Sequence, residues 1–252
     1  MHKIHPQFTP PDDETTTIWR YMAISKFASM LATSSLWFAR ADQFKDAFEG
    51  SSPKINIAAR QLPSYLSTKD ASIFHNLMEN TTLAKQHWVR YIAINCWQMN
   101  VAESTAMWDL YLPPTKDGLA VQSTFKNFKD SLRTEESVYI GKVIYIDYEH
   151  QVIEHESTLA PFLHKRKAFE HERELRAIIV RPPPPGTKGL NFGVETIERG
   201  IQVSVDLKLL ISKVYIAPQA PIDLAANIKA LIIKYGYNFE IKSSGLAEEP
   251  KF

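Results

Sequence analysis

The residues best suited to chemistry are concentrated in one stretch of this chain. Glu172, Glu174 and Arg176 occur at alternate positions and lead into an apolar segment that ends at Val180. If the stretch is extended, the two-residue period of a strand places these three ionisable side chains on one face. Carboxylates on a buried strand need partners, so such a row is typical of a cleft or a salt-bridged rim. The alternative is a helix in which Glu172 and Arg176 form an i,i+4 pair on a solvated face.

An arginine within an aromatic run is the second candidate. Arg20 lies between Trp19 and Tyr21, in a segment whose composition favours a strand. A guanidinium at this position could clamp a phosphate group through two parallel hydrogen bonds. Alternatively, the arginine stacks on Trp19 or forms a pair across strands.

Two further carboxylates follow a strand predicted at 36–39. Asp46 and Glu49 alternate with phenylalanines in a segment that ends at Gly50, a residue typical of chain stops. They could belong to a site. The alternative is a tight structural turn, with Asp46 as a cap and the phenylalanines in the core.

An aromatic stripe is predicted on a short helix over 103–111. Ser104, Met107, Trp108 and Tyr111 recur at i, i+3, i+4 and i+7, which places them on one helix face. Such a stripe is either part of the core or a platform for a ligand ring.

Several common signatures are absent from the sequence. It has no Gly-rich dinucleotide or phosphate loop, no HExxH motif and no serine in a nucleophile elbow. The single cysteine, Cys96, excludes a Cys-rich zinc site. The spacing of His155, His164 and His171 fits no metal-binding helix face, so we predict no metal site there.

Composition places the chain in the soluble globular class. Its 252 residues are 44% hydrophobic and carry a net charge of +1. No apolar run approaches the roughly 20 residues of a membrane helix, so no membrane association is expected. The lone Cys96 and the lack of a signal peptide favour a cytoplasmic protein. A local basic patch could still bind nucleic acid.

The elements that position these residues indicate one α+β domain over 18–252, preceded by a loose arm over 1–17. Strands and helices alternate irregularly, which argues against a doubly wound sheet. The run Pro182–Gly189 is predicted to be a long loop that leaves a sheet edge. Strands are predicted over 18–22, 36–39, 91–97, 119–124, 138–148, 201–205, 214–216 and 239–241. Helices are predicted after a Ser25 cap and over 58–90 (as an insert), 103–111, 125–132 and 222–235.

The order of these motifs resembles a known family. The segments LWFARADQFKDAFEG, CW, ESTAMWDLY, LAVQSTF and FEHERELR follow one another as they do in the bacterial domain of unknown function 2971. The resemblance extends over 19–246. The sequence departs from the family pattern at Lys45–Ala47, where Asn-Asp-Pro is usual, and at Phe169, where Trp is common. The charged residues of the pattern match at Asp46, Glu49, Glu172, Glu174 and Arg176.

More remotely, the order is similar to the plan of ADP-ribosyltransferases, which implies a mixed, split sheet and NAD as a co-substrate. Under this resemblance Arg20 would bind NAD with Tyr21 beside it, and Phe38 would lie near the nicotinamide. Glu172 and Glu174 would form the family's Glu-x-Glu motif, with Glu174 as the catalytic carboxylate. Trp37, Trp97, Trp108 and Tyr111 are candidates to stack on a ring of the ligand.

Three functions remain open from the sequence. The first is an NAD-using transferase or NAD glycohydrolase, acting as a toxin or in phage defence on an unknown macromolecular or small-molecule acceptor. The second is a metal-dependent nuclease or phosphodiesterase. Its Mg²⁺ would be held by Asp46, Glu49, Glu172 and Glu174, and Arg176 or Lys167 would contact phosphate. The third is a non-catalytic interaction domain in which the charged residues are structural.

Overall fold

The structure is a computed structural model that describes residues 1–59, 86–112, 117–154, 157–187 and 189–247. Its strands are β1 (Thr17–Ala23), β2 (Ser35–Arg40), β3 (Ile92–Met99), β4 (Gly118–Thr124), β5 (Tyr139–Lys142), β6 (Ile144–Ile146), β7 (His164–Arg166), β8 (Glu174–Val180), β9 (Pro185–Gly186), β10 (Gly189–Leu190), β11 (Gly200–Ser204), β12 (Lys213–Ile216) and β13 (Glu240–Ser243). The α-helices are α1 (Ile24–Thr33), α2 (Lys54–Ala58), α4 (Thr105–Tyr111), α5 (Phe125–Ser131), α6 (Leu207–Leu210) and α7 (Leu224–Lys234). The 3₁₀ helices are η1 (Ala41–Gln43), η2 (Val89–Tyr91), η3 (Ala160–Leu163), η4 (Lys167–Glu172) and η5 (Gly245–Ala247).

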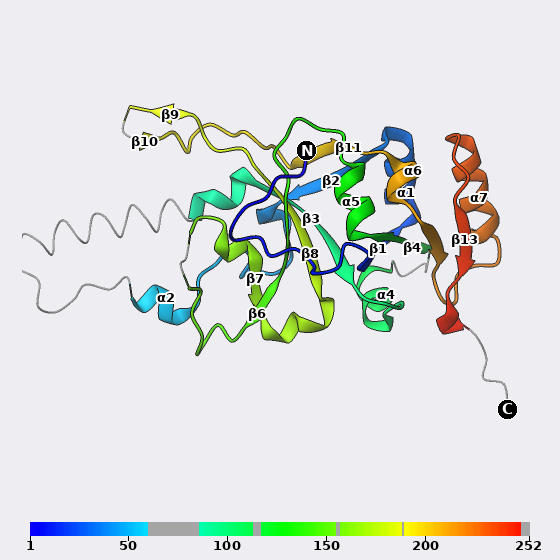
Figure 1. Ribbon diagram of the computed structural model, residues 1–252, viewed down its shortest axis with the longest axis horizontal. Coiled ribbons are helices and arrows are strands. Elements are labelled where there is room, and N and C mark those ends of the chain that lie inside the picture. The colour runs from blue at the N-terminus through cyan, green and yellow to red at the C-terminus, as the bar shows by residue number, and fades with distance from the viewer. Residues whose placement is uncertain (60–85, 113–116, 155–156, 188, 248–252) are drawn as a thin grey trace, which may run out of the picture.

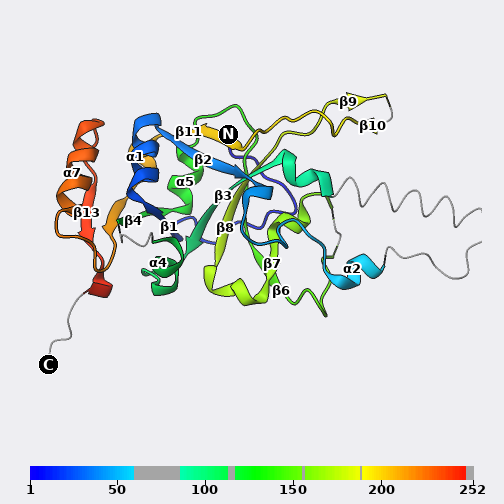
Figure 2. The same cartoon turned by 180° about the vertical axis from the view of Figure 1, so that it is seen from behind.

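The fold is α+β, with helices packed around one mixed sheet, as the sequence predicts (Figure 1). Most strand pairs are antiparallel, and β12 pairs with β13 in parallel. Seen from both sides, α7 and β13 lie at one end of the molecule and the β9–β10 ribbon projects from the other (Figures 1 and 2). The proline run after β8 leads away from the main sheet into this ribbon, which begins at Pro185; the segment follows a strand paired on both sides and does not leave from a sheet edge as expected.

The main sheet is split along one edge of β3. On that edge β2 pairs with β3 only at Ala93 and Ile94, and β1 pairs with it only at Gln98 and Met99. On the opposite edge β8 pairs with β3 along its length, from Ile92 to Gln98. Strands β1 and β2 therefore diverge, and between their pairing points β3 has no strand partner on this side.

A side chain replaces the missing strand contacts in the split. The Asn95 Nδ2 donates to the backbone carbonyl of Trp37 on β2 at 2.9 Å. The Asn95 Oδ1 accepts a 2.8 Å hydrogen bond from the Trp97 indole. Asn95 is buried, so these contacts satisfy groups that would otherwise lack partners.

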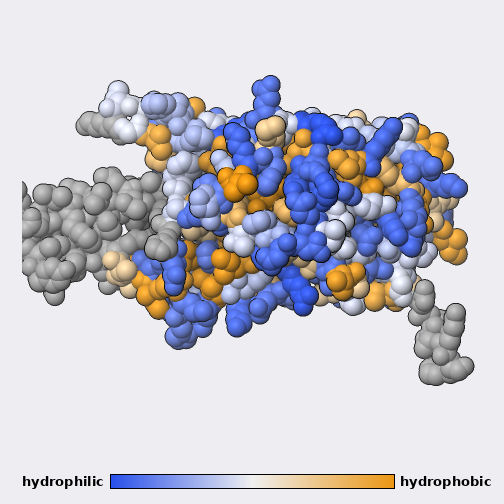
Figure 3. All heavy atoms as spheres, in the orientation of Figure 1, coloured by the Kyte–Doolittle hydropathy of each residue, from blue (hydrophilic) through white to orange (hydrophobic). Residues whose placement is uncertain are grey.

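Strand alternation divides the core between the two faces of the sheet. One face carries Ile18, Met22, Leu175 and Ala177 and packs against α1, α5, α6 and α7 in the largest apolar cluster. The other face is covered by α4 at one end, through Met107 and Trp108. Farther along this second face, Ile94 and Ile178 pack against Phe162 and Phe8. On the molecular surface shown in Figure 3, hydrophilic residues surround scattered hydrophobic ones, as is usual where protein meets water.

The expectation of a loose N-terminal arm was wrong for its first half. His2 pairs with Val138, the Thr9 carbonyl accepts from the Lys142 N–H, and Phe8 is buried beside Tyr139. A Cβ at Gly141 would lie 3.0 Å from the Phe8 backbone, so a glycine at this position allows the arm to lie close to β5. Polar composition alone predicted looseness, but the arm covers the edge of the sheet.

Most predicted elements are present, with a few corrections. The strand predicted over 138–148 is broken into β5 and β6, because β5 stays in the main sheet while β6 pairs with β7. Helix α1 begins one residue before Ser25, so Ser25 is not its cap. The helical insert expected over 58–90 falls mainly on residues 60–85, outside the described residues. None of the described helices is long and apolar enough to cross a membrane.

Candidate functional site

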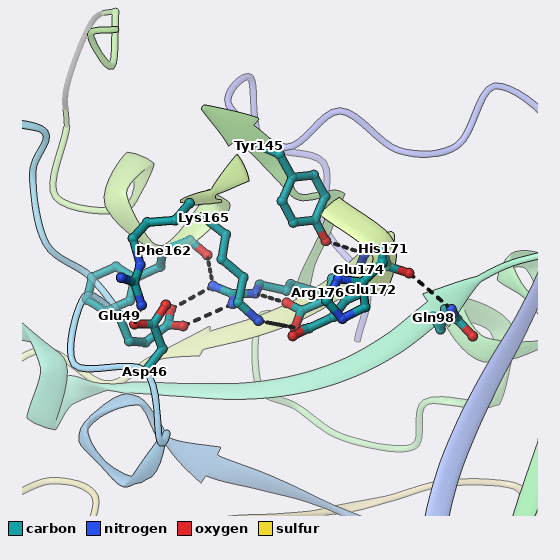
Figure 4. Close-up of polar contacts among 11 residues, drawn as sticks. Asp46, Glu49, Gln98, Tyr145, Phe162, Lys165, His171, Glu172, Glu174 and Arg176 are labelled. Carbon is teal, nitrogen blue, oxygen red and sulfur yellow. Dashed lines mark hydrogen bonds and ion pairs between the residues drawn. The ribbon is translucent and has the colours of Figure 1, made fainter. Parts of the chain in front are cut away.

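Five charged side chains form a buried cluster at the start of β8 (Figure 4). They are Glu49, Lys165, Glu172, Glu174 and Arg176, called the charged cluster below. Arg176 has no exposed surface; its Nη1 and Nη2 bind the two oxygens of Glu49 at 2.6 and 3.0 Å, and its Nε binds Glu174 at 2.6 Å. Lys165 Nζ lies 2.5 Å from Glu172 and 3.0 Å from Glu174. Each cation therefore joins two carboxylates.

The charges of the cluster balance when one carboxyl group is protonated. Burial and the neighbouring Glu174 raise the pKa of Glu172 to about 7. Although burial opposes ionisation of Glu174, the nearby Arg176 and Lys165 hold its pKa well below the usual value. A neutral Glu172 leaves two carboxyl groups, those of Glu49 and Glu174, facing two cations. Burial raises the pKa of Glu49, and the attraction of Arg176 opposes that rise. The cluster thus keeps Glu174 ionised in a buried place.

A strained turn explains how the local sequence forms this cluster. The alternate charges do not all lie on one strand, because β8 begins at Glu174 and Glu172 ends η4. Between them Arg173 has φ 41°, in the left-handed region that non-glycine residues rarely adopt. The turn returns the chain beside β7, so Lys165 meets both glutamates. The helical alternative for Glu172 and Arg176 was therefore wrong.

Asp46 lies beside this cluster and has a different partner. Its Oδ1 accepts from Arg166 at 2.8 Å and from the Phe48 N–H at 3.0 Å. The turn predicted around Asp46 is thus present. Phe44 packs against the core as a partly buried residue, whereas Phe48 is exposed and contacts Arg166 and Tyr148. All four carboxylates of the predicted Mg²⁺ site are paired with basic side chains. Within the part of the chain that the structure describes, no three His, Cys, Asp or Glu side chains are grouped to hold a metal ion.

A pocket of about 380 Å³ lies where the sheet splits. It is lined from both faces of the sheet, as expected at a gap between diverging strands. Its polar and aromatic lining comes mainly from β1, α1, β2, β3, α4, β8 and β11, and includes Arg20, Trp37, Trp97, Gln98, Tyr111 and Glu174. The pocket therefore brings the predicted arginine on β1 and the predicted carboxylate on β8 to a common space.

Arg20 is a cation without an anionic partner. Among the residues that the structure describes, its buried Nη1 has no hydrogen-bond partner and no carboxylate forms an ion pair with it. Its guanidinium lies 5.9 Å from the centre of a Trp97 ring. Burial lowers the pKa of Arg20, but an arginine keeps its charge in any protein environment. A charged group in this state favours an anionic ligand.

The other predicted ligand-binding residues divide into two groups. Tyr21 and Tyr111 line the pocket, whereas Phe38 and Trp108 are buried in the core and do not. Alternation along β2 turns Phe38 inward and leaves the half-exposed Trp37 at the pocket. The Tyr21 hydroxyl accepts from the Ser104 N–H at 2.9 Å, so Tyr21 also holds the start of α4. Burial raises the pKa of Tyr21 to about 12, which keeps this hydroxyl neutral.

Sequence reasoning missed two residues of the site. Lys165 occurs in a run of basic residues that suggests a solvated surface, yet it is buried between two glutamates. Gln98 follows the strand predicted over 91–97, and its Oε1 is buried with no partner in the part of the chain that the structure describes. A signal did exist for Gln98, since a polar residue in an otherwise apolar buried strand calls for an explanation.

Comparisons with known proteins add little to this geometry. No family model matches the chain, and no curated protein matches it. The resemblance to domain of unknown function 2971 therefore stays a prediction. Among solved structures, the chain is similar to Thermus sp. 2.9 DarT in complex with carba-NAD+. The TM-score is 0.39 at 9% identity, covering 92% of this chain and 96% of that chain. A likeness at this level carries no argument about function, so the proposal below is based on the site itself.

Proposed function

We propose that this protein binds NAD in the split of its sheet and cleaves the bond between nicotinamide and ribose. It would act as an ADP-ribosyltransferase or an NAD glycohydrolase. The observation that carries the proposal is Arg20, a partly exposed cation that lines a pocket together with Glu174 and whose buried Nη1 has no hydrogen-bond partner among the described residues. A dinucleotide supplies the phosphate that such a cation favours and the planar rings that Trp37 and Tyr111 could contact.

The charged cluster supports the chemistry of bond cleavage. When nicotinamide leaves, its nitrogen takes the bonding electron pair and the ribose C1 gains oxocarbenium character. An ionised carboxylate held in place stabilises that developing positive charge. Glu174 has this property, because Arg176 and Lys165 keep its pKa low. Its Oε1 accepts from Lys165 and its Oε2 from Arg176, so the two cations hold the carboxylate in place.

The second half of the reaction requires a nucleophile. Water attack at C1 would give ADP-ribose, whereas attack by an acceptor oxygen or nitrogen would transfer the ADP-ribosyl group. In either case the nucleophile forms the new bond to C1 and loses one proton to solvent. We leave the acceptor open, and a role as a toxin or in phage defence stays a prediction.

The two rival functions have less support. A Mg²⁺-dependent phosphodiesterase would need carboxylates that are free to bind metal, but those of the charged cluster and Asp46 already bind cationic side chains. An interaction domain would account for the charged cluster as a structural feature. It would not account for an unpaired arginine in a pocket, because burying such a charge costs stability.

Thermal unfolding with and without NAD, together with an assay for released nicotinamide, tests the proposal. We expect NAD to raise the Tm of the wild-type protein and nicotinamide to be released. Arg20→Ala should lose the NAD-dependent shift, because it removes the anion-binding group. Glu174→Gln should keep a shift and lose at least about 100-fold in release, the usual scale for one electrostatic group in a transition state.

Matched controls separate these effects from unfolding. Arg133→Ala removes an exposed surface arginine that pairs with Asp206, and it should respond to NAD like the wild type. Glu172→Gln replaces the carboxyl beside Glu174 with a neutral amide of similar size. It therefore reports whether a change within the charged cluster by itself affects folding. Absence of both a shift and nicotinamide release in the wild type would contradict the proposal and favour the interaction domain.

A further inference from the structure

Gln98 lines the pocket and carries an acceptor that no described residue uses. The residue is 2% exposed, and its Oε1 is buried with no hydrogen-bond partner among the described residues. Leaving such a group unpaired costs free energy in a folded protein, so it calls for a partner that the chain itself does not supply. Gln98 also lines the pocket that contains Arg20 and Glu174. The unpaired oxygen therefore belongs to a residue at the wall of a cavity able to hold a ligand.

The orientation of the Gln98 amide follows from the hydrogen bond that its nitrogen donates. Its Nε2 donates to the backbone carbonyl of His171 at 3.4 Å (Figure 4). A carbonyl oxygen only accepts, so exchanging the amide nitrogen and oxygen would place two acceptors against each other. His171 lies in η4, the turn that ends at Glu172. The turn that forms the charged cluster thus also fixes which amide atom of Gln98 is left for the pocket.

The register of the sheet places Gln98 beside the carboxylate proposed to act at the scissile bond. Gln98 on β3 and Glu174 on β8 are Cα partners, and side chains of directly paired residues lie on the same face. A part of a ligand that contacts Gln98 is therefore close to the part that contacts Glu174. Under the proposed function, that ligand group belongs to the nicotinamide end of NAD.

We propose that the Oε1 of Gln98 accepts a hydrogen bond from the primary carboxamide of nicotinamide and thereby selects NAD over its acid analogue. This inference rests on the proposed function and adds a specificity residue to it. An N–H donor is the partner that an unpaired acceptor lacks, and the carboxamide is a donor on the ring whose nitrogen leaves. The carboxylate of the acid analogue has no hydrogen to donate and would face the glutamine oxygen as a second acceptor.

Binding of three dinucleotides to the wild-type protein tests this inference. The probes are NAD, nicotinic acid adenine dinucleotide, and nicotinamide hypoxanthine dinucleotide, in which the adenine amino group is replaced. We expect the acid analogue to bind at least about tenfold more weakly than NAD, the effect of one lost hydrogen bond that leaves a buried acceptor unpaired. The hypoxanthine analogue should bind within about threefold of NAD, because the proposed contact does not involve adenine.

Two variants complete the experiment. Gln98→Met keeps the size of the side chain and removes the acceptor, so NAD should bind about tenfold more weakly and the preference over the acid should disappear. Gln122→Met is the matched control. Gln122 pairs with Trp19 from the side opposite Gln98 and does not line the pocket, so this variant should keep the wild-type preference.

The outcomes separate this inference from the proposed function. Equal binding of NAD and the acid analogue by the wild type would overturn the role of Gln98 and leave NAD binding intact. Weak binding of the hypoxanthine analogue would instead assign the contact to the adenine amino group and overturn the carboxamide. Full preference retained in a folded Gln98→Met protein would also overturn it. If the wild type does not bind NAD, the proposed function fails and this inference fails with it.

Discussion

Arg20 and Glu174 line the same pocket although strand alternation assigns them to opposite faces of the sheet. Arg20 alternates with Trp19 and Tyr21 on β1, and its register partner Val121 belongs to the main core. Glu174 lies on the face of Gln98 and Arg176. The two side chains share a cavity only because β1 and β2 diverge from each other along β3. The split in the sheet therefore creates the cavity that these two side chains share.

Removing the charge of Arg20 is expected to stabilise the free protein. Arg20→Met keeps much of the side-chain volume and removes a partly exposed cation whose buried Nη1 has no partner among the described residues. We expect a Tm about 2–4 °C higher than that of the wild type, corresponding to about 1 kcal/mol in a chain of this size. The same variant should not respond to NAD. Differential scanning calorimetry gives both values, and a clear drop in the Tm of the free variant would show that Arg20 is a structural residue.

The contact between Glu49 and Arg176 should be strongly coupled. Arg176→Met leaves two buried carboxylates without their cation and is expected to cost about 3–5 kcal/mol in the free energy of unfolding. Adding Glu49→Gln to Arg176→Met should lower the free energy of unfolding little further, because the second substitution removes one of the two uncompensated carboxylates. Urea unfolding of both single variants and the double variant gives the coupling energy. Additive effects would argue against the bidentate contact.

The stability of the protein should fall as pH rises through the range where Glu172 loses its proton. The pKa of Glu172 in the folded protein is about 7, above the ordinary value, so the folded state binds the proton more tightly. This contribution is complete below about pH 4.5 and is lost as pH rises through about 7. Lys165 favours ionisation and Glu174 opposes it, and the second effect is the larger.

Glu172→Gln should remove this pH dependence, because glutamine does not titrate. Relative to the wild type, the variant should gain on the order of 2 kcal/mol in unfolding free energy between pH 5 and pH 8. Urea unfolding at several pH values measures the difference. Glu170→Gln changes an exposed carboxylate of the same turn and should show no such gain. A constant difference between Glu172→Gln and the wild type would contradict the raised pKa.

Asn95 is expected to be essential for the packing of the split. Asn95→Leu would leave the Trp37 carbonyl and the Trp97 indole N–H without their partners. Unpaired buried groups cost about 1–3 kcal/mol each, so a loss of about 2–5 kcal/mol is expected. Amide hydrogen exchange should also quicken along β2 and the adjoining part of β3. The exposed Asn227→Leu on α7 is the control and should change stability by less than about 0.5 kcal/mol.

The amino-acid sequence determined the local elements and the candidates for chemistry. Hydrophobic periodicity located most strands and helices, since it depends only on which face of each element is buried. The segment around β8 was predicted as a buried strand with charges on one side, and Glu174 and Arg176 do lie on one face. The aromatic run around Arg20 was likewise a strand. These features are local, so neighbouring residues are sufficient to specify them.

Only the tertiary structure decided which residues meet. The sequence around Lys165 suggested a surface lysine, but the left-handed turn at Arg173 places two glutamates beside it. Phe38 and Trp37 are adjacent in sequence, but the packing of β2 turned one into the core and the other to the pocket. Gln98 gained its role from its register with Glu174. Register, burial and strand divergence depend on partners far away in the chain. They cannot be derived from the spacing of residues along one segment.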